Sequence, residues 1–236
     1  MIEFKEVVKL YGNTIAIDRI NIKLPETGIY CLLGRNGAGK TTFMKLLAGH
    51  IEATEGEIAV DGKPVSPRRM PENVNFITSG GDLFNIKISS LIDMATALKD
   101  DFDRIFALKM MARFELAPGK KYRSLSFGMK TMLTTILTLA NTTGAVLLDE
   151  PTLGFDPIMR DRFNTLLMES FSLHPRLIIV STHLIDEIAK ISERLIIIDQ
   201  GRILLESGIN DIHGAAADNF SLQDFFINLV GGKNNE

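Results

Sequence analysis

The chain has 236 residues, enough for one α/β domain with a well-buried core and room for a helical insertion. Its 26 Lys and Arg residues and 29 Asp and Glu residues give a net charge of −3, which offers no global electrostatic reason to bind nucleic acid, so we expect no nucleic-acid partner. The single cysteine excludes an intrachain disulfide. The N-terminus is charged, which argues against a secretory signal, and no apolar run reaches the roughly 18 residues that a membrane span needs. We therefore expect a cytoplasmic protein.

Short apolar runs alternate with helical patterns along most of the chain, which predicts an α/β fold. We expect strands at residues 2–10, 16–24, 29–33, 58–60, 63–65, 74–78, 145–148, 177–180, 195–198 and 202–205. We expect helices at residues 43–48, after 156 and at 220–230. Several of the strand runs are continuously apolar, as is typical of parallel strands that are buried on both faces.

Residues 84–141 break this alternation, because their apolar positions repeat with a helical period. Ser89 and Ser90 are candidates to cap one helix. Asp100 and Asp101 stand at the expected start of a second helix. A third is expected to start near Ser126. We interpret this segment as a helical subdomain inserted into a single domain that spans residues 1–236.

A glycine-rich stretch joins the strand expected at 29–33 to the helix expected at 43–48. It reads Gly34, Arg35, Asn36, Gly37, Ala38, Gly39, Lys40, Thr41 and Thr42, and all but Arg35 are candidate nucleotide contacts. Glycine, four residues and then Gly-Lys-Thr is the pattern of a phosphate-binding loop. Free N–H groups at the helix N-terminus favour bound phosphates. Lys40 can reach the terminal phosphates and Thr41 can hold Mg²⁺, so we expect a nucleoside triphosphate with Mg²⁺ as the ligand.

Two carboxylates follow the apolar run at 145–148. Asp149 is expected at the sheet edge beside the phosphate-binding loop, where it can bind Mg²⁺ directly or through water. Glu150 can polarise an attacking water. An Asp-Glu pair after a strand would by itself be read as a solvated loop, but the phosphate-binding loop makes the catalytic interpretation the favoured one.

Five motifs, taken together, resemble the ATP-binding subunits of ABC transporters in their order and spacing. They are the phosphate-binding loop, Leu-Ser-Phe-Gly-Met-Lys at 125–130, Leu-Leu-Asp-Glu-Pro at 147–151, Leu-Gly-Phe-Asp-Pro at 153–157 and Ser-Thr-His at 181–183. The Ser-x-Gly-Met-Lys form, without the Gln-Gln-Arg continuation common in importer subunits, is most similar to the bacterial branch that exports drugs, antibiotics and antimicrobial peptides. The resemblance implies a P-loop NTPase of ABC-type architecture, with a mostly parallel core sheet, an N-terminal antiparallel β subdomain and an inserted helical subdomain.

The resemblance also implies that two subunits share each nucleotide site. Ser126 and Gly128 match the signature motif, which contacts the γ-phosphate of ATP bound to the other subunit. Asp156 matches the loop that links the two sites across the dimer. The residues by themselves support a simpler interpretation, because serine and aspartate are both good helix N-caps.

Two further roles depend on the same resemblance. His183 matches the switch histidine, which contacts the γ-phosphate and helps to hold Glu150 and the attacking water. A lone histidine after an apolar strand is more often structural. Tyr11 matches the aromatic residue that stacks on adenine, with a packed core tyrosine as the alternative.

The sequence departs from the family pattern in two places. The family usually has a glutamine that touches Mg²⁺ at the end of the strand expected at 74–78, where this chain has Ser79. The alternatives there are ligation through water, ligation by Ser79, or no ligand at this position. The signature reads Phe127-Gly128-Met129 instead of Gly-Gly-Gln, which adds bulk beside the phosphate of the other subunit. This second departure bears on the hydrolysis rate or on the choice of dimer partner.

The expected function is that of an ATP-binding and ATP-hydrolysing subunit, which pairs with a second ATPase subunit, the same or different, around two ATP molecules. It would power a separate integral-membrane permease, an exporter, at the inner face of the cell membrane. Met94, Met110 and Met111 are candidates for the surface that contacts the permease, with core packing as the alternative. The alternative functions are an ABC-type ATPase outside transport and a weakly hydrolysing regulatory subunit.

Overall fold

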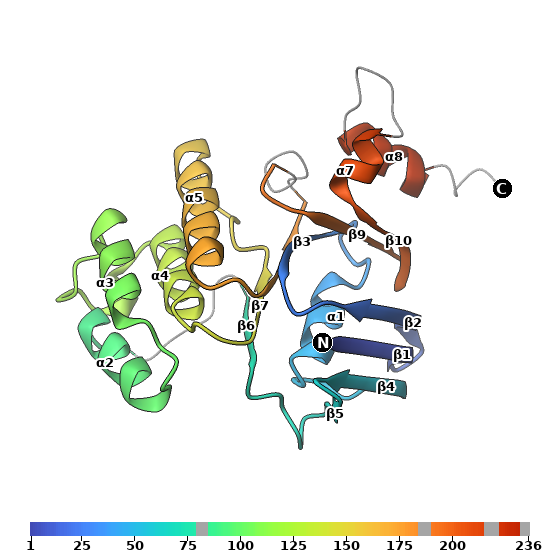
Figure 1. The fold of residues 1–236 in the computed structure, drawn as a ribbon, viewed down its shortest axis with the longest axis horizontal. Helices are drawn as coiled ribbons and strands as arrows, with labels where there is room; N and C mark the ends of the chain where they lie inside the picture. Colours follow the sequence, from blue (N-terminus) through green and yellow to red (C-terminus); the bar gives the residue numbers. More distant parts are fainter. Residues whose placement is uncertain (79–84, 184–189, 215–221, 232–236) are drawn as a thin grey trace.

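The computed structural model of the chain describes residues 1–78, 85–183, 190–214 and 222–231 (Figure 1). Its strands are β1 (Ile2–Tyr11), β2 (Thr14–Leu24), β3 (Gly28–Leu33), β4 (Glu55–Val60), β5 (Lys63–Pro64), β6 (Val74–Thr78), β7 (Ala145–Asp149), β8 (Leu177–Thr182), β9 (Arg194–Asp199) and β10 (Arg202–Gly208). Its helices are α1 (Lys40–Leu47), α2 (Ile88–Leu98), α3 (Arg104–Arg113), the 3-10 helix η1 (Tyr122–Ser124), α4 (Phe127–Leu139), α5 (Pro157–Leu173), α7 (Ile209–Gly214) and α8 (Leu222–Gly231). No helix within these ranges has both the length and the apolar character needed to cross a bilayer.

The strands form two sheets. The first is antiparallel, in the order β2-β1-β4-β5, and the second has the order β10-β9-β3-β8-β7-β6. In the second sheet only the pairing of β10 with β9 is antiparallel. The predicted α/β fold, with a mostly parallel core sheet and an N-terminal antiparallel sheet, is confirmed. Because β3 lies between β8 and β9, the glycine-rich loop that leaves β3 emerges at the centre of the carboxyl edge, where open α/β sheets bind ligands.

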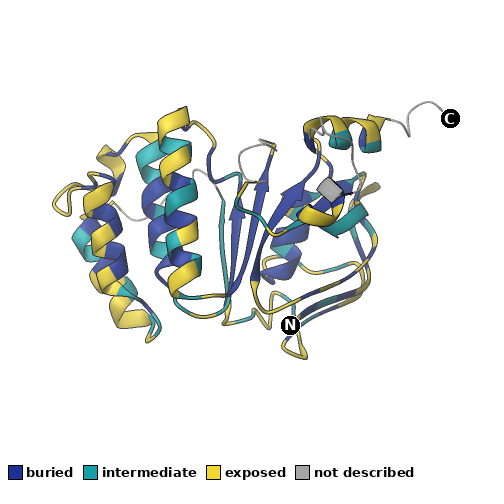
Figure 2. Ribbon diagram, turned by 45° about the horizontal axis from the view of Figure 1, so that its top comes forward, coloured by how far each residue is buried: buried dark blue, intermediate teal, exposed yellow. Residues whose placement is uncertain are grey.

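The mixed sheet is buried on both faces. Along β3, Ile29, Cys31 and Leu33 point into a core shared with α5 and with the helical segment, which consists of α2, α3 and α4. Tyr30 and Leu32 point the other way, into a core shared with α1 and the antiparallel sheet. Successive side chains of a strand alternate between faces, so this continuously apolar strand serves two cores. Figure 2 shows the result, with buried residues concentrated on the central strands and on the helix faces turned toward them.

The helix α2 begins without the predicted serine cap. Its N-cap is Lys87, and no side chain caps the helix. The first N–H groups, those of Ile88 and Ser89, instead donate to the carbonyl oxygens of Lys120 and Pro118 at 3.0 Å each. The expectation that Ser89 or Ser90 caps this helix is therefore wrong, because a distant loop already satisfies the donors that a cap would take.

The N-cap of α3 lies two residues beyond the predicted Asp101. Asp103 is its N-cap and accepts a hydrogen bond from the Phe106 N–H at 2.8 Å. The Asp101 carboxylate is used elsewhere, because its Oδ2 accepts hydrogen bonds from Thr143 Oγ1 at 2.6 Å and Thr143 N at 3.3 Å. That contact spans 42 residues and holds the helical segment to the start of β7.

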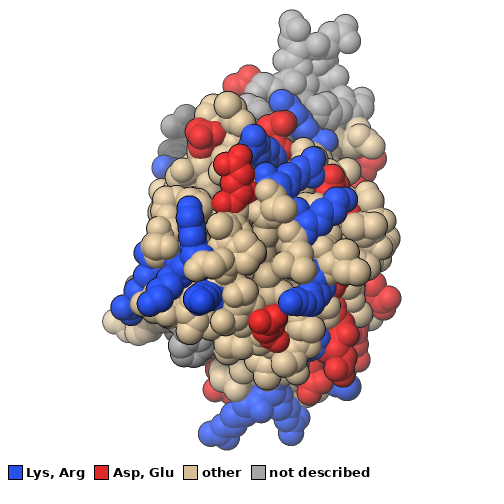
Figure 3. Space-filling model, turned by 90° about the vertical axis from the view of Figure 1, so that its left-hand side faces the viewer, with Lys and Arg blue, Asp and Glu red and all other residues tan. Residues whose placement is uncertain are grey.

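Of the three candidate methionines, only Met94 is exposed. Met110 and Met111 are fully buried in the core, so the expectation that they contact a partner is wrong. The exposed large apolar side chains of residues 85–141 are those of Met94, Leu98, Ile105, Leu108 and Phe127. Lys and Arg side chains gather around the uncharged surface of this end of the molecule (Figure 3). Residues 85–141 carry nine Lys and Arg and five Asp and Glu, so this segment is basic within an acidic chain.

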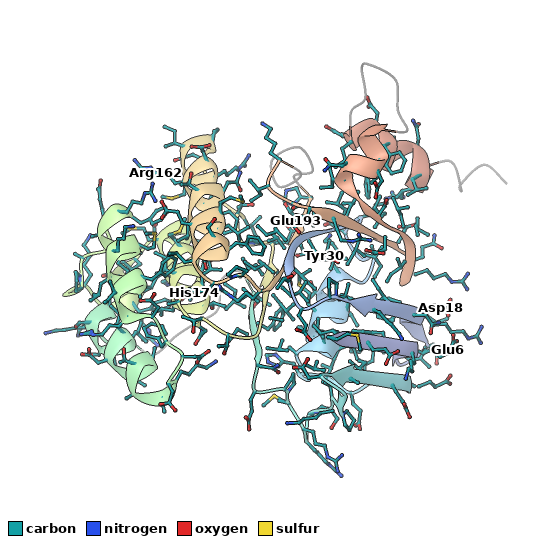
Figure 4. The ribbon with its side chains drawn as sticks, viewed as in Figure 1. Glu6, Asp18, Tyr30, Arg162, His174 and Glu193 are labelled. Atoms are coloured by element: carbon teal, nitrogen blue, oxygen red, sulfur yellow. The ribbon has the colours of Figure 1, made fainter. Side chains whose placement is uncertain are left out.

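Arg176, just before β8, joins the C-terminal ends of two helices. Its guanidinium is 3% exposed and donates to Leu139 O of α4 at 2.8 Å. It also donates to Ser170 Oγ at 2.8 Å and to His174 O at 2.7 Å, both at the end of α5. Burial lowers the pKa of Arg176 to about 10. His174 lies at the end of α5 that faces the helical segment (Figure 4), and its Nε2 is 3.4 Å from Asp103 Oδ2.

Gly144, just before β7, is expected to be intolerant of a side chain. Its φ is +77°, and a Cβ there would lie 2.1 Å from Asn73 O, which accepts a hydrogen bond from Ala145 N. We expect Gly144→Ala to lower the free energy of unfolding by about 3 kcal/mol in urea denaturation. Gly119→Ala is the control, because its Cβ would meet nothing within 4 Å, and a change below about 0.5 kcal/mol is expected. Equal stability of the two variants would contradict the prediction.

Candidate active site

The glycine-rich loop forms a cradle between β3 and α1. Gly37 and Gly39 have φ of +81° and +112°, and Gly39 is the N-cap of α1 without any side-chain cap. A Cβ on Gly39 would lie 2.7 Å from Ala16 O, and one on Gly34 would lie 2.5 Å from Ile198 O. Glycine is therefore required at both positions for steric reasons. The uncapped N-terminus of α1 leaves backbone N–H groups free for an anion.

A cavity of about 250 Å³ opens at this cradle. Its lining residues are Ala16, Arg35, Asn36, Gly37, Ala38, Gly39, Lys40, Thr41, Thr42 and Glu150. The structure thus brings the predicted loop contacts from Asn36 to Thr42 together with the predicted catalytic carboxylate. Gly34 lines a neighbouring cavity instead.

Lys40 is held inside the loop. Its Nζ donates to Gly34 O at 2.7 Å and lies 3.7 Å from Glu150 Oε1, and the side chain is almost fully buried. Burying an ammonium group is costly unless hydrogen bonds and an opposite charge compensate for the lost water. The loop therefore fixes one positive charge beside the Glu150 carboxylate, at the mouth of the cavity that the free N–H groups line.

Asp149 is fixed by two hydroxyl groups. Thr41 Oγ1 donates to Asp149 Oδ2 at 2.7 Å, and Ser181 Oγ donates to Asp149 Oδ1 at 2.5 Å. Asp149 and Ser181 are register partners at the ends of the parallel strands β7 and β8, which explains why they meet. The carboxylate is thereby aimed at the first turn of α1, directly behind the phosphate-binding loop.

Glu150 adopts an unusual backbone conformation next to this carboxylate. Its φ is +48°, in the left-handed region that a glutamate rarely visits. Its N–H donates to Ser181 Oγ at 3.0 Å, and its Oε2 lies 2.9 Å from His183 Nδ1. Such a conformation costs about 1–3 kcal/mol and persists where the surroundings over-determine it, commonly at functional sites. The turn directs the Glu150 carboxylate toward both Lys40 and His183.

The remaining predicted contacts lie away from this cavity in the described part of the chain. Ser126 caps α4 by accepting from Met129 N at 3.3 Å, and Asp156 caps α5 by accepting from Met159 N at 2.8 Å, so both predicted caps are confirmed. Neither residue lines either cavity at the loop, nor does Gly128. Ser79 lies outside the described residues.

Tyr11 ends β1 and is 49% exposed, with Lys9 Nζ 5.3 Å from its ring centroid. The alternative of a packed core tyrosine is therefore wrong. An exposed aromatic ring with a cation beside it is available to stack on a flat ligand.

Sequence reasoning missed the role of Ser181. The residue was noticed only as part of the Ser-Thr-His motif, yet its hydroxyl donates to Asp149 and accepts from the Glu150 N–H. The signal was available, because a polar residue at the end of an apolar strand lies level with the polar ends of neighbouring parallel strands.

Ser181→Ala is expected to lower the rate of ATP hydrolysis about tenfold and to raise the Mg²⁺ concentration needed for half-maximal rate. The physical reason is that Asp149 and the backbone of Glu150 both lose the hydroxyl that positions them. Phosphate release measured across a Mg²⁺ titration checks this. Ser124→Ala is the matched control, because its exposed hydroxyl only donates to Lys121 O. An unchanged Mg²⁺ dependence in Ser181→Ala would show that Asp149 needs no such support.

The comparisons with known proteins agree with this geometry. The sequence profile of the family described as "ABC transporter" matches residues 17–153. The chain is 30% identical over 209 residues to the lantibiotic transport ATP-binding protein SrtF of Streptococcus pyogenes, covering 87% of this chain and 90% of that protein.

Solved structures share the fold. The chain is similar to the structure titled "Structure of ATP binding subunit of ABC transporter", with a TM-score of 0.84, 20% identity and coverage of 97% of this chain and 99% of that one. It is also similar to a bacterial ABC transporter cassette, MJ0796, in its dimeric structure, with a TM-score of 0.76, 22% identity and coverage of 89% and 99%. With the family match over more than half of its length, the chain belongs to the ABC transporter family, as an ATP-binding subunit and an ABC-type ATPase.

Proposed function

We propose that Glu150 is the general base of ATP hydrolysis in this chain. The observation that carries the proposal is the convergence of Lys40 and His183 on the two oxygens of the Glu150 carboxylate, at 3.7 Å and 2.9 Å. A carboxylate held in this way, at the mouth of the phosphate cavity, can accept the proton of a water that attacks the γ-phosphorus in line. Lys40 stabilises the charge that develops on the phosphate oxygens, and His183 holds Glu150 and the water in position.

The residues around Thr41 suit Mg²⁺. Thr41 Oγ1 and Asp149 Oδ2 are 2.7 Å apart, and both are oxygen donors of the kind that this ion prefers. We propose Thr41 and Asp149 as the protein's ligands, with the ATP phosphates supplying others, as is common for Mg²⁺. When bound, the ion neutralises charge on the phosphates. Ser79, which follows β6 in the sequence and lies outside the described residues, remains the alternative ligand.

The nucleotide contacts extend beyond the loop on this proposal. Gly34 and residues 36–42 hold the phosphates through backbone N–H groups, and Tyr11 stacks on the adenine. The exposure of the Tyr11 ring and the free N-terminus of α1 support these assignments.

A second subunit completes the site in this proposal. The N-terminus of α4, which the Ser126 side chain caps, presents backbone N–H groups suited to an anion. Ser126 and Gly128 lie outside the cavity of their own chain. Their phosphate partner would then be an ATP molecule held by the loop of another subunit, with Asp156 linking the two sites. The cassette MJ0796, whose fold this chain shares, has a dimeric structure, which supports the pairing of two subunits by analogy.

Mixing two inactive variants tests the shared site. Lys40→Ala disables the phosphate-binding loop and Ser126→Ala disables the contact across the dimer, so neither variant is expected to hydrolyse ATP alone. A mixed dimer has one site in which both elements are intact. With random pairing, half of the dimers are mixed and each has one working site of two, so the mixture should recover about a quarter of the wild-type rate. No recovery in the mixture would contradict a site shared between subunits.

The finer biological role is also a proposal. We infer that the chain is one ABC-type ATPase domain over residues 1–236, with the helical subdomain at about 84–141, and that it works at the inner face of the cell membrane through a separate permease. The name of the relative SrtF, a lantibiotic transport protein, supports a role in transport, and export is supported by relatives named as Nod factor export ATP-binding proteins. The exposed apolar residues of α2 and α3 and their basic surroundings are available for contact with the permease (Figure 3).

Co-purification tests this role. Tagged protein purified from detergent-solubilised native membranes should bring down a multi-span membrane protein, and recovery of the chain alone would contradict the proposal.

A further inference from the structure

A second cavity, of about 440 Å³, adjoins the phosphate-binding loop. Its lining residues are Leu33, Gly34, Arg35, Asn36, Glu150, Leu153, Thr182, His183 and Phe226. Leu33, Leu153 and Phe226 give it an apolar wall, although it lies beside the catalytic carboxylate. Phe226 comes from α8, nearly 200 residues away from the loop in sequence. Hydrolysis of ATP requires polar groups that contact water and phosphate, so the reaction by itself does not require this apolar wall.

The same chain exposes an aromatic ring that has no counterpart in the usual signature motif. Phe127 is the first residue of α4 and is 45% exposed. One side of its ring rests on Gly154, where a Cβ would lie 3.2 Å from Phe127 Cδ1. Gly154 is next to Leu153, whose side chain lines the cavity. The ring is thus supported from behind and presented to solvent at its front.

We propose that Phe127 of a second copy of this chain fills the apolar part of this cavity, against Phe226 and Leu153. The inference rests on the proposed function, because it specifies the partner that completes the nucleotide site. In a two-fold symmetric dimer each subunit offers both a ring and a cavity, so the contact forms twice. An aromatic pair buried from water contributes more than its area alone, through edge or offset stacking.

The polarity of the two surfaces favours the same occupant. The apolar side of the cavity is formed by Leu33, Leu153 and Phe226, whereas Arg35, Glu150 and His183 make up its charged side. Insertion of Phe127 therefore brings an exposed aromatic ring toward an apolar wall and leaves the charged side to the nucleotide. The phenylalanine that departs from the family's glycine then acts as a specificity element that favours a partner with a matching cavity.

Site-directed cross-linking of the full chain tests this placement. The native Cys31 is fully buried, and burial raises the pKa of its thiol, so it does not compete for reaction. Both F127C and F226C are made in the Glu150→Gln background, which we expect to bind ATP without hydrolysing it. The two purified proteins are mixed with ATP and Mg²⁺, and a bismaleimide with a short spacer is added. We expect the mixture to give a cross-linked dimer only when ATP is present. Neither protein alone should give the F127C–F226C cross-link, because neither carries both cysteines.

The matched control replaces F226C by I227C. Ile227 is the next residue of α8, is exposed and does not line the cavity, so at least a fivefold lower yield is expected. Light scattering of each mixture shows independently whether a dimer forms. A dimer without the F127C–F226C cross-link, or with equal yields for both α8 positions, overturns the inference and leaves the proposed function intact. Absence of a dimer also overturns it, since the occupant is a second copy. The recovery of ATP hydrolysis when Lys40→Ala is mixed with Ser126→Ala then tests separately whether two subunits share a nucleotide site.

Single and double truncations give a second test that does not depend on cross-linking. In the Glu150→Gln background, we expect Phe127→Ala and Phe226→Ala each to raise the dimer dissociation constant in ATP about tenfold. The double variant should be little worse than either single variant, because both remove the same contact. Multiplicative effects in the double variant would show that the two rings do not meet. Circular dichroism of each variant confirms that the fold is retained.

Discussion

Glu150→Gln should lower the steady-state rate of ATP hydrolysis by a factor of about 10² to 10⁴ while ATP binding persists. The glutamine side chain has the same shape and can still hydrogen-bond to His183, but it cannot accept a proton from water. The carboxylate lies 2.9 Å from His183 Nδ1 and 3.7 Å from Lys40 Nζ, and the change removes the group that we propose as the base. Phosphate release gives the rate, and equilibrium binding of a fluorescent ATP analogue gives the affinity.

The same variant should accumulate as an ATP-bound dimer, because ATP that is not hydrolysed continues to bridge the two subunits at the proposed shared site. Size-exclusion chromatography with light scattering in ATP and Mg²⁺ measures this. Glu193→Gln is the control, since Glu193 is exposed and precedes β9 at the opposite end of the parallel strands (Figure 4). It should hydrolyse ATP at the wild-type rate. If Glu150→Gln retains more than a tenth of wild-type turnover, the assignment of Glu150 as the base is wrong.

Arg176→Met is expected to have the largest effect on stability, lowering the free energy of unfolding by about 3–5 kcal/mol. Methionine fills a similar volume but donates no hydrogen bond. Leu139 O and Ser170 Oγ, both buried, would lose donors at 2.8 Å, and the partly buried His174 O would lose one at 2.7 Å. Each buried acceptor left unsatisfied costs about 1–3 kcal/mol.

Chemical denaturation followed by far-UV circular dichroism measures this change. Arg162→Met on α5 is the matched control, because Arg162 is exposed on the outer side of that helix (Figure 4), and a change within about 0.5 kcal/mol is expected. Since Arg176 is remote from the phosphate-binding loop, the folded fraction of Arg176→Met should hydrolyse ATP normally. A similar small effect for both arginines would mean that the helix ends find other donors.

Sequence reasoning was most successful where the chemistry depends on neighbours in the chain. The phosphate-binding loop is a local pattern in which the strand, the glycines and the helix N-terminus follow one another, so its position and its cradle could be predicted directly. Ser126 and Asp156 were also predicted correctly as helix caps, because the group that each one satisfies lies three residues away. Asp149 and Glu150 could be placed at the sheet edge because they end an apolar strand.

The same reasoning failed where a distant segment satisfied the polar group. Asp101 was expected at the start of α3, but Thr143 takes its carboxylate and Asp103 becomes the cap. The serines of α2 were expected to cap it, but the carbonyl of Lys120 accepts the first N–H. Both outcomes depend on contacts that span tens of residues, and no local pattern records them.

The sequence by itself determined the fold class, the position of the phosphate-binding loop and the carboxylates that face it, because these follow from apolar periodicity and from groups adjacent in the chain. Only the tertiary structure decided that Ser181 joins Asp149 to Glu150, that Phe226 closes a cavity beside the loop, and that Met110 and Met111 are core. The physical reason is that parallel strands and packed helices bring together side chains from separate segments. Burial and hydrogen bonding are then settled by those neighbours and not by the residue's own place in the chain.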